Sequence, residues 1–272
     1  MADMKKIATR DSYGKAITQL GAEHNDIVVM DADLAGSTKS GVFRKEFPNR
    51  HFNCGIAEGN MMAAAAGMAA GEDSRWSSHQ CCEDFALMRT IPGMVVMCPA
   101  DDAEAQAAVR AAYEHDGPVY IRTGRLAVPQ FHESVDFGFK IGKGEVLREG
   151  NDIAIIATGL MVAEAVAAAD ALAEKGIHAR VINLCTIKPL DEELVVKAAK
   201  ECGKVITCEE HNILGGLGEA VCGVLSEKCP TPVRRIGVND EFGHSGPAAA
   251  LLKEFGLSAE HIAEVAEEFV KA

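Results

Sequence analysis

The chain has 272 residues, of which 48% are hydrophobic and 25% charged, a globular composition with room for two α/β domains. Its net charge of −13 argues against a surface for nucleic acid or anionic membranes, and an aromatic content of 5% leaves little for base stacking. The nine cysteines lack CxxC pairs and zinc-finger spacing, and no apolar run has the length of a membrane span, so we expect a cytoplasmic protein with reduced thiols.

Strand and helix patterns alternate along the first half of the chain. The expected elements are helices at residues 12–24, 56–69 and 101–115 and strands at 26–33, 51–55, 94–100 and 117–125. Between the second helix and the third strand, residues 71–83 are polar and show neither period. The alternation should supply another strand and helix there, so the first domain lacks one unit.

The second half resumes the alternation after a stretch rich in Pro, Phe and Gly, where we place a linker at residues 129–139. The expected elements are strands at residues 152–158, 178–184, 204–210 and 232–238 and helices at 162–176, 191–202 and 215–228, followed by C-terminal helices. Continuous Val/Ile strands between helices indicate parallel sheets covered on both faces. The predicted fold is α/β, with two doubly wound parallel-sheet domains at residues 1–128 and 140–272.

Glu58 stands inside GIAEGNMMAAAAGMAAG (residues 55–71), a stretch that is otherwise almost entirely small or apolar. A carboxylate buried there without a partner would be costly. It is either a helix N-terminal acid stabilised by the helix dipole or a desolvated acid that shares a proton with a ring nitrogen of a ligand. The small neighbours favour the second interpretation because they allow a ligand to approach the backbone closely.

Polar side chains also follow a predicted strand in MDADLAGSTKS, where Asp31, Asp33, Ser37 and Thr38 come just past its carboxyl end. Open α/β sheets bind ligands at that edge. The simpler interpretation is a strand-to-helix loop with a Ser or Thr cap.

Two further groups of residues have both a structural and a functional interpretation. Arg125 ends another predicted strand, close to Arg122 in the sequence. It is either a surface arginine or a ligand for a phosphate group. His79 lies in a non-periodic loop with Glu72 and Asp73, which makes it an acid/base candidate, although a single histidine is usually structural.

A glycine-rich turn occurs in EEHNILGGLGEAV (residues 209–221), which resembles a phosphate-binding turn at a helix start. Glycine is routine at such turns, so this signal is weak. The sequence has no P-loop, GxSxG or HExxH motif.

Four segments together resemble the C-terminal half of a transketolase. They are DADLAGST (31–38), FNCGIAEGNM (52–61), HQCCEDFALMRTIPGMVVMCPADDAEA (79–105) and EEHNILGGLGEAV (209–221). The similarity covers nearly the whole chain in the family's order. It implies the C-terminal subunit of a split transketolase, made of a pyrimidine-binding domain and a C-terminal domain.

The resemblance implies a function for Glu58. In the family, the glutamate at this position hydrogen-bonds the aminopyrimidine of thiamine diphosphate and promotes the tautomer that deprotonates the thiazolium C2. The cofactor then carries a two-carbon ketol unit from a ketose phosphate to an aldose phosphate. This is a transferase reaction of the pentose phosphate pathway.

The resemblance also implies roles for other residues of this chain. Asp33 and Leu34 would lie near the rings of the cofactor, and Arg10, Ser37 and Arg125 would hold the sugar phosphate. Arg125 is preferred to Arg122 by its spacing to Pro129 in the sequence.

Asp73 and His79 match family positions that contact substrate hydroxyls, and we expect His79 to be catalytic as well. Five residues separate them here, where the family usually has three. In the family, a strand and a helix with stacking aromatics precede this loop. In this chain GMAAGED (residues 67–73) leads directly from the Glu58 helix into the loop, without that strand and helix. This apparent internal deletion near residues 70–78 is natural, engineered or a stretch omitted from the sequence. Trp76 is the only aromatic residue near enough in the sequence to replace the stacking aromatics.

The sequence contains no GDG motif followed by an asparagine, which in thiamine enzymes binds the diphosphate and Mg²⁺. The resemblance therefore implies that an N-terminal partner subunit carries that site, within an assembly of two copies of each chain. No metal ligands are expected in this chain. The alternatives are a 1-deoxyxylulose-5-phosphate synthase-like or 2-oxo-acid dehydrogenase β-like subunit, or a partner subunit that the deletion has made non-catalytic.

Overall fold

A computed structural model describes residues 5–61, 64 and 82–272 of the chain. Its contacts divide the chain into two compact units, which we call the first and second unit. The first unit comprises Met1–His79 and Gly93–Ile141, and the second comprises Gln80–Pro92 and Gly142–Ala272. A short segment from the first half of the sequence therefore packs with the second unit.

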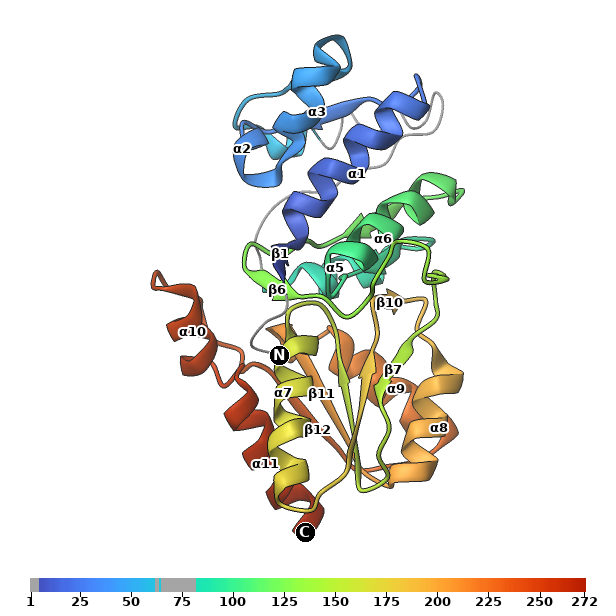
Figure 1. Ribbon diagram of the computed structural model, residues 1–272, viewed down its shortest axis with the longest axis vertical. Helices are drawn as coiled ribbons and strands as arrows, with labels where there is room; N and C mark the ends of the chain where they lie inside the picture. The colour runs from blue at the N-terminus through green and yellow to red at the C-terminus, as the bar shows by residue number, and fades with distance from the viewer. Residues whose placement is uncertain (1–4, 62–63, 65–81) are drawn as a thin grey trace. The chain divides into compact units, whose positions relative to one another are not determined.

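The first unit builds small sheets and helices around its amino-terminal helix (Figure 1). Strands β2 and β3 pair in parallel, as do β4 and β5, whereas β1 and β6 pair antiparallel. Its elements are β1 (Lys6–Ala8), α1 (Thr9–Glu23), β2 (Val29–Asp31), α2 (Ala35–Thr38), α3 (Ser40–Glu46), the 3₁₀-helix η1 (Pro48–Arg50), β3 (His51–Asn53), β4 (Val95–Met97), α6 (Asp102–Glu114), β5 (Val119–Ile121) and β6 (Ala127–Pro129).

Helix α1 packs against both α3 and α6. It approaches the backbone of another segment closely at Gly14, where an added Cβ would lie 2.7 Å from the backbone carbonyl oxygen of Lys39. Lys39 has a φ of +67° and separates α2 from α3. A glycine is therefore required where α1 crosses this turn, and the crossing brings the start of α1 close to α2.

The buried carboxylate of Asp101 ties α6 to the segment that follows β6. Its Oδ1 caps the helix by accepting from the backbone N–H of Glu104 at 2.8 Å. Its Oδ2 accepts from the backbone N–H groups of Phe131 and His132, at 2.7 and 2.8 Å, and lies 2.9 Å from Nδ1 of His132. Burial alone would raise the pKa of Asp101, but the hydrogen bonds from His132 and the backbone outweigh it, so the pKa falls below its usual 3.8.

We expect Asp101→Asn to lower the free energy of unfolding by about 2–3 kcal/mol near neutral pH, because an amide replaces an ionised acceptor of several buried donors. A lowered carboxyl pKa stabilises the fold above the unfolded value, and this contribution disappears as the pH falls through the folded pKa. The difference between variant and wild type should therefore shrink below about pH 4 in urea unfolding curves. The exposed Asp136→Asn is the control, and a difference that is equal at both pH values would contradict the assignment.

The second unit contains a five-stranded sheet in the order β12-β11-β8-β9-β7. Four strands run parallel, and β7 pairs antiparallel with β9. Its elements are α5 (Asp84–Thr90), β7 (Glu145–Arg148), β8 (Ile153–Ala157), α7 (Met161–Glu174), β9 (Ala179–Asn183), β10 (Thr186–Lys188), α8 (Glu192–Cys202), β11 (Val205–Asn212), α9 (Leu217–Lys228), β12 (Val233–Val238), α10 (Ala248–Glu254) and α11 (Ala259–Lys271).

Helices cover both faces of this sheet, with α7 and α11 packed together on one face and α8 and α9 on the other (Figure 1). Every residue of β8 and β9 is buried, as expected for central strands of a doubly wound sheet. The predicted α/β fold with helices on both faces of a parallel sheet is confirmed. None of the helices in the described part of the chain is long and apolar enough to cross a membrane.

His211 holds α5 in the second unit. The backbone N–H of Ala86 donates to its Nε2 at 3.3 Å, so Nδ1 carries the proton and donates to the carbonyl of Asn212 at 2.6 Å. The ring of Phe85 stacks on the imidazole with centroids 4.9 Å apart. Arg89, at the end of the same helix, donates to the carbonyls of Gly215 and Gly216. A fully buried histidine in this setting organises the fold.

Candidate functional site

The loop after β2 is organised by the buried carboxylate of Asp31. Its Oδ1 accepts from the backbone N–H of Leu34 at 2.5 Å, and its Oδ2 accepts from the hydroxyls of Thr38 and Ser40 at 3.1 and 2.7 Å. These bonds close the loop into the short helix α2 and fix Leu34. The strand-to-helix loop is present, but no Ser or Thr caps either helix, because the hydroxyls of Thr38 and Ser40 donate to Asp31 instead.

Neutral groups surround Asp31 on its other side. Burial, and then the charge of Asp31, raise the pKa of Tyr13 to about 12. Burial also lowers the pKa of His51, although Asp31 acts in the opposite direction. The Nδ1 of His51 has no hydrogen-bond partner among the described residues, and its Nε2 lies 3.4 Å from the hydroxyl of Ser40. The burial and the hydrogen bonds of Asp31 therefore give it a structural role in this loop.

Asp33 lies at the exposed edge of the same loop, directly above the ends of β2 and β3. It adopts a φ of +63°, which is uncommon for a residue with a side chain. Asn53, the last residue of β3, accepts from the backbone N–H of Asp33 at 3.0 Å and donates to its carboxylate at 3.1 Å. Asn53 and Asp31 are register partners in the parallel pair, so both loops leave the sheet at the same edge.

Arg10 is placed beside Ser37 by the first turn of α1. The hydroxyl of Thr9 accepts from the backbone N–H of Gly124 at 2.7 Å, which ties the helix start to the segment before Arg125. The Nη1 of Arg10 reaches the backbone carbonyl of Ser37 at 3.4 Å. Its Nε is buried and has no hydrogen-bond partner in the described part of the chain. Over the residues that the structure describes, Arg10 thus has an unsatisfied donor at Nε beside the Ser37 loop.

The side chain of Arg125 is exposed, as is that of Ser37. Arg122 is half-buried, and its backbone N–H donates to the carbonyl of Met97 at 2.9 Å. Arg125, which was preferred by its spacing to Pro129, is therefore also more exposed to solvent than Arg122.

Glu58 begins a helical turn, and the backbone N–H of Met61 donates to the carbonyl of Ala57 at 2.9 Å. The expectation of full burial is wrong within this chain, because the Glu58 side chain is half-buried. A Cβ built on Gly55 or Gly59 would meet no described atom within 4 Å. Among the described residues, Gly55 and Gly59 therefore leave the backbone beside Glu58 open rather than packed.

Large apolar side chains border this open surface. Phe52 is 48% exposed and Ile56 is 82% exposed. Phe52 is the middle residue of β3, and Ile56 follows Gly55 on the segment that leads from β3 to Glu58. Phe52 and Ile56, which we call the apolar rim, are suited to contact the ring of a ligand or another protein chain.

The structure brings together most of the residues that the sequence analysis selected. Hydrogen bonds link the segments that carry Arg10, Ser37 and Arg125, and Asn53 links Asp33 to the segment before Glu58. Asp73 and His79 lie outside the described residues. Within the described ranges, no group of three or more His, Cys, Asp or Glu side chains could hold a metal ion.

The GGLG turn in the second unit does not offer a free phosphate site. The buried carboxylate of Glu209 accepts from the backbone N–H groups of Leu217 and Gly218, at 2.6 and 2.8 Å. These are the first amides of α9, which a phosphate would otherwise use. The carboxylate of Glu209 therefore occupies the amides that a phosphate would use, and the predicted similarity to a phosphate-binding turn does not hold here.

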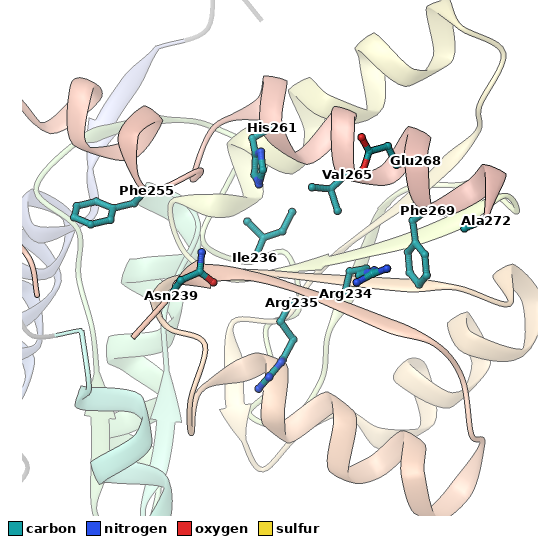
Figure 2. Close-up of a pocket in the computed structure, with 11 residues that line it drawn as sticks. Arg234, Arg235, Ile236, Asn239, Phe255, His261, Val265, Glu268, Phe269 and Ala272 are labelled. Carbon is teal, nitrogen blue, oxygen red and sulfur yellow. The ribbon is translucent and has the colours of Figure 1, made fainter. Parts of the chain in front are cut away.

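A pocket of about 420 Å³ lies in the second unit between β12 and α11 (Figure 2). His261 points into it from α11, whereas Arg235 points to the opposite side of β12 and pairs with Glu219 at 3.6 Å. The guanidinium of Arg234 lies 5.3 Å from the ring of Phe269. Arg234 and Arg235 therefore already have partners. None of the described candidate site residues from the sequence analysis lines this pocket.

Models of two protein domains match the chain. Residues 5–76 and 70–130 match the transketolase pyrimidine-binding domain in two pieces, and residues 142–262 match the transketolase C-terminal domain.

Two relatives and one solved structure show the same similarity over nearly their whole length. A putative transketolase C-terminal section of Methanocaldococcus jannaschii is 40% identical, covering 96% of each chain. A 6-deoxy-6-sulfo-D-fructose transketolase subunit of Clostridium sp. is 38% identical, covering 95% of this chain and 93% of that protein. A split-gene transketolase, described as an inactive β4 tetramer, is 42% identical with a TM-score of 0.88, covering 98% of this chain and 99% of that one.

These comparisons also bear on the missing unit. The alignment with the Methanocaldococcus protein is 309 positions long, whereas 96% of 272 residues is about 261, so about 48 positions fall opposite gaps in this chain. The pyrimidine-binding match breaks at residues 70–76. Both observations agree with the loss of a strand and a helix at this point of the sequence.

Proposed function

This chain belongs to the transketolase family, and from that premise we propose that it is the catalytic C-terminal subunit of a split transketolase. Its pyrimidine-binding domain implies dependence on thiamine diphosphate. The proposed reaction transfers a two-carbon ketol unit from a ketose phosphate to an aldose phosphate. The observation that carries the proposal is the hydrogen-bonded arrangement of Asp33, Leu34 and the Glu58 segment at the common edge of β2 and β3.

The residues at this edge fit the cofactor that the family uses. The open backbone at Gly55 and Gly59 leaves room for a flat ring beside Glu58, and the exposed Phe52 and Ile56 supply an apolar border. The unpartnered Nε of Arg10 is a donor suited to a phosphate oxygen. At one end of the site, the carboxylate and amide groups thus suit a heterocyclic ring. At the other end, the guanidinium groups suit a sugar phosphate.

Glu58 would hold and exchange a proton with a ring nitrogen, a role that suits a half-buried carboxylate at a helix start. Leu34, fixed through Asp31, and Asp33, fixed through Asn53, would orient the rings. Bound thiamine diphosphate supplies an acidic carbon and an electron sink, which protein side chains lack.

The substrate would lie against the other groups of the site. Arg10, Ser37 and Arg125 would hold the sugar phosphate through charged forks and a hydroxyl. Asp73 would bind substrate hydroxyls, and His79 would bind them and move protons.

An N-terminal transketolase subunit would complete the site by binding the diphosphate and Mg²⁺, in a cytoplasmic assembly of two copies of each chain. Three observations support this assignment: the chain has no diphosphate motif, its relative in Clostridium is a subunit, and the rim of Phe52 and Ile56 is uncovered. The split-gene relative described as an inactive β4 tetramer is consistent with a chain that needs a partner for activity.

We expect the chain mixed with its N-terminal partner, thiamine diphosphate and Mg²⁺ to convert ribose 5-phosphate with a ketose phosphate, and neither chain to do so alone. Pyruvate with glyceraldehyde 3-phosphate should give no product. Product from pyruvate instead would show a 1-deoxyxylulose-5-phosphate synthase-like enzyme. A stable complex without turnover of either pair would show a non-catalytic partner subunit.

A further inference from the structure

One exposed carboxamide connects the two loops of the proposed site. The Oδ1 of Asn53 accepts from the backbone N–H of Asp33 at 3.0 Å and from that of Gly55 at 2.9 Å. Its Nδ2 donates to the carboxylate of Asp33 at 3.1 Å. All three contacts lie within the first unit.

Both of the backbones that Asn53 holds are in the left-handed region. Asp33 has a φ of +63° and Gly55 a φ of +69°. Glycine adopts this conformation freely, but an aspartate does so against its side-chain sterics and needs support from its surroundings. Asn53 supplies that support at both the amide and the side chain of Asp33.

We propose that Asn53 is the positioning residue that sets the Asp33–Leu34 turn relative to the start of the Glu58 helix, and thereby tunes cofactor affinity. This inference rests on the proposed function. The role requires a carboxamide, because one atom must accept two N–H groups while the other donates to a carboxylate. Aspartate has the same shape but no donor, and it would place a second negative charge against Asp33.

The first test uses amide hydrogen exchange in the full chain without cofactor. We expect Asn53→Ala to speed exchange at Asp33 and Gly55 by about three- to tenfold, because both amides lose their acceptor. Asn49→Ala is the matched control, since Asn49 is exposed and lies outside the contact. Unchanged exchange in Asn53→Ala would overturn the proposal without bearing on the function of the chain.

The second test measures thiamine diphosphate affinity in the complex with the N-terminal subunit. Asn53→Asp should bind about tenfold more weakly near pH 8 and recover on lowering the pH to about 5.5, because a proton shared with Asp33 restores the donor. Asn53→Ala should show no such recovery, which separates positioning from a general loss of stability. Wild-type affinity of Asn53→Asp near pH 8 would overturn the proposal. A wild-type complex that binds no cofactor would refute the proposed function instead, while the exchange result would still test the positioning role of Asn53.

Discussion

Replacing Glu58 by glutamine is expected to lower the rate of two-carbon transfer in the reconstituted enzyme by about 10²–10⁴-fold, the usual contribution of a positioned acid/base group. Glutamine keeps the shape of the side chain but cannot hold or exchange the proton. The measurement is kcat under saturating cofactor and substrate, with cofactor affinity determined separately.

Glu46→Gln provides the matched control for this substitution, because Glu46 is an exposed glutamate at the end of α3. It should retain the activity of the wild type. If Glu58→Gln were to retain activity within about twofold of that control, Glu58 would have no acid/base role, and the proposed mechanism would be wrong.

The second large effect is expected at Asp31. Removing its carboxylate in Asp31→Ala leaves the backbone N–H of Leu34 and the hydroxyl of Ser40 without their acceptor in a buried environment, whereas the hydroxyl of Thr38 keeps the carbonyl of Leu34 at 3.1 Å. We expect a loss of about 3–4 kcal/mol in the free energy of unfolding, measured by urea denaturation of the chain.

Asp11→Ala is the comparison for Asp31→Ala, since Asp11 forms only an exposed ion pair with Lys39 at 3.1 Å. Such a pair contributes about 0–1 kcal/mol. Equal destabilisation by the two substitutions would show that the hydrogen bonds of Asp31 do not hold the loop. Cofactor affinity should fall in Asp31→Ala and stay unchanged in Asp11→Ala, because only Asp31 fixes Leu34.

The fold of the second unit could be predicted from the sequence because its strands are continuous apolar runs. Strands β8, β9, β11 and β12 and helices α7, α8 and α9 all lie within or close to the predicted ranges. The antiparallel edge strand β7 and the short strand β10 were not predicted, because strands of three or four residues carry no clear period.

The first unit was harder to predict, because its elements are held by side-chain contacts rather than by long periodic patterns. Helices α2 and α3 are four and seven residues long, and the contacts of Asp31 and Gly14 fix them in place. Helix α5 was not predicted. It follows the polar stretch and packs through His211, which lies 125 residues from Ala86 in the sequence. Contacts over such separations cannot be read from local composition.

The rule that ligands bind at the carboxyl ends of parallel strands selected Asp31, Asp33, Ser37 and Thr38. The family resemblance, not this rule, supplied Arg10, Leu34 and the choice of Arg125. The same rule could have found Asn53, because it is the last residue of β3 and the register partner of Asp31. Glu58 was selected as a buried charge, whereas the chain leaves it half-buried beside an open backbone. In the proposed assembly the partner chain would cover this carboxylate, which the sequence of one chain does not show.

Titration of thiamine diphosphate in the presence of Mg²⁺ into the complex of this chain with its N-terminal partner tests the central claim most directly. The account predicts saturable calorimetric binding by the complex, with one cofactor for each pair of chains, and no binding by either chain alone. A folded complex that binds no cofactor would contradict it, and the chain would then be a transketolase half by descent that serves only as an interaction subunit.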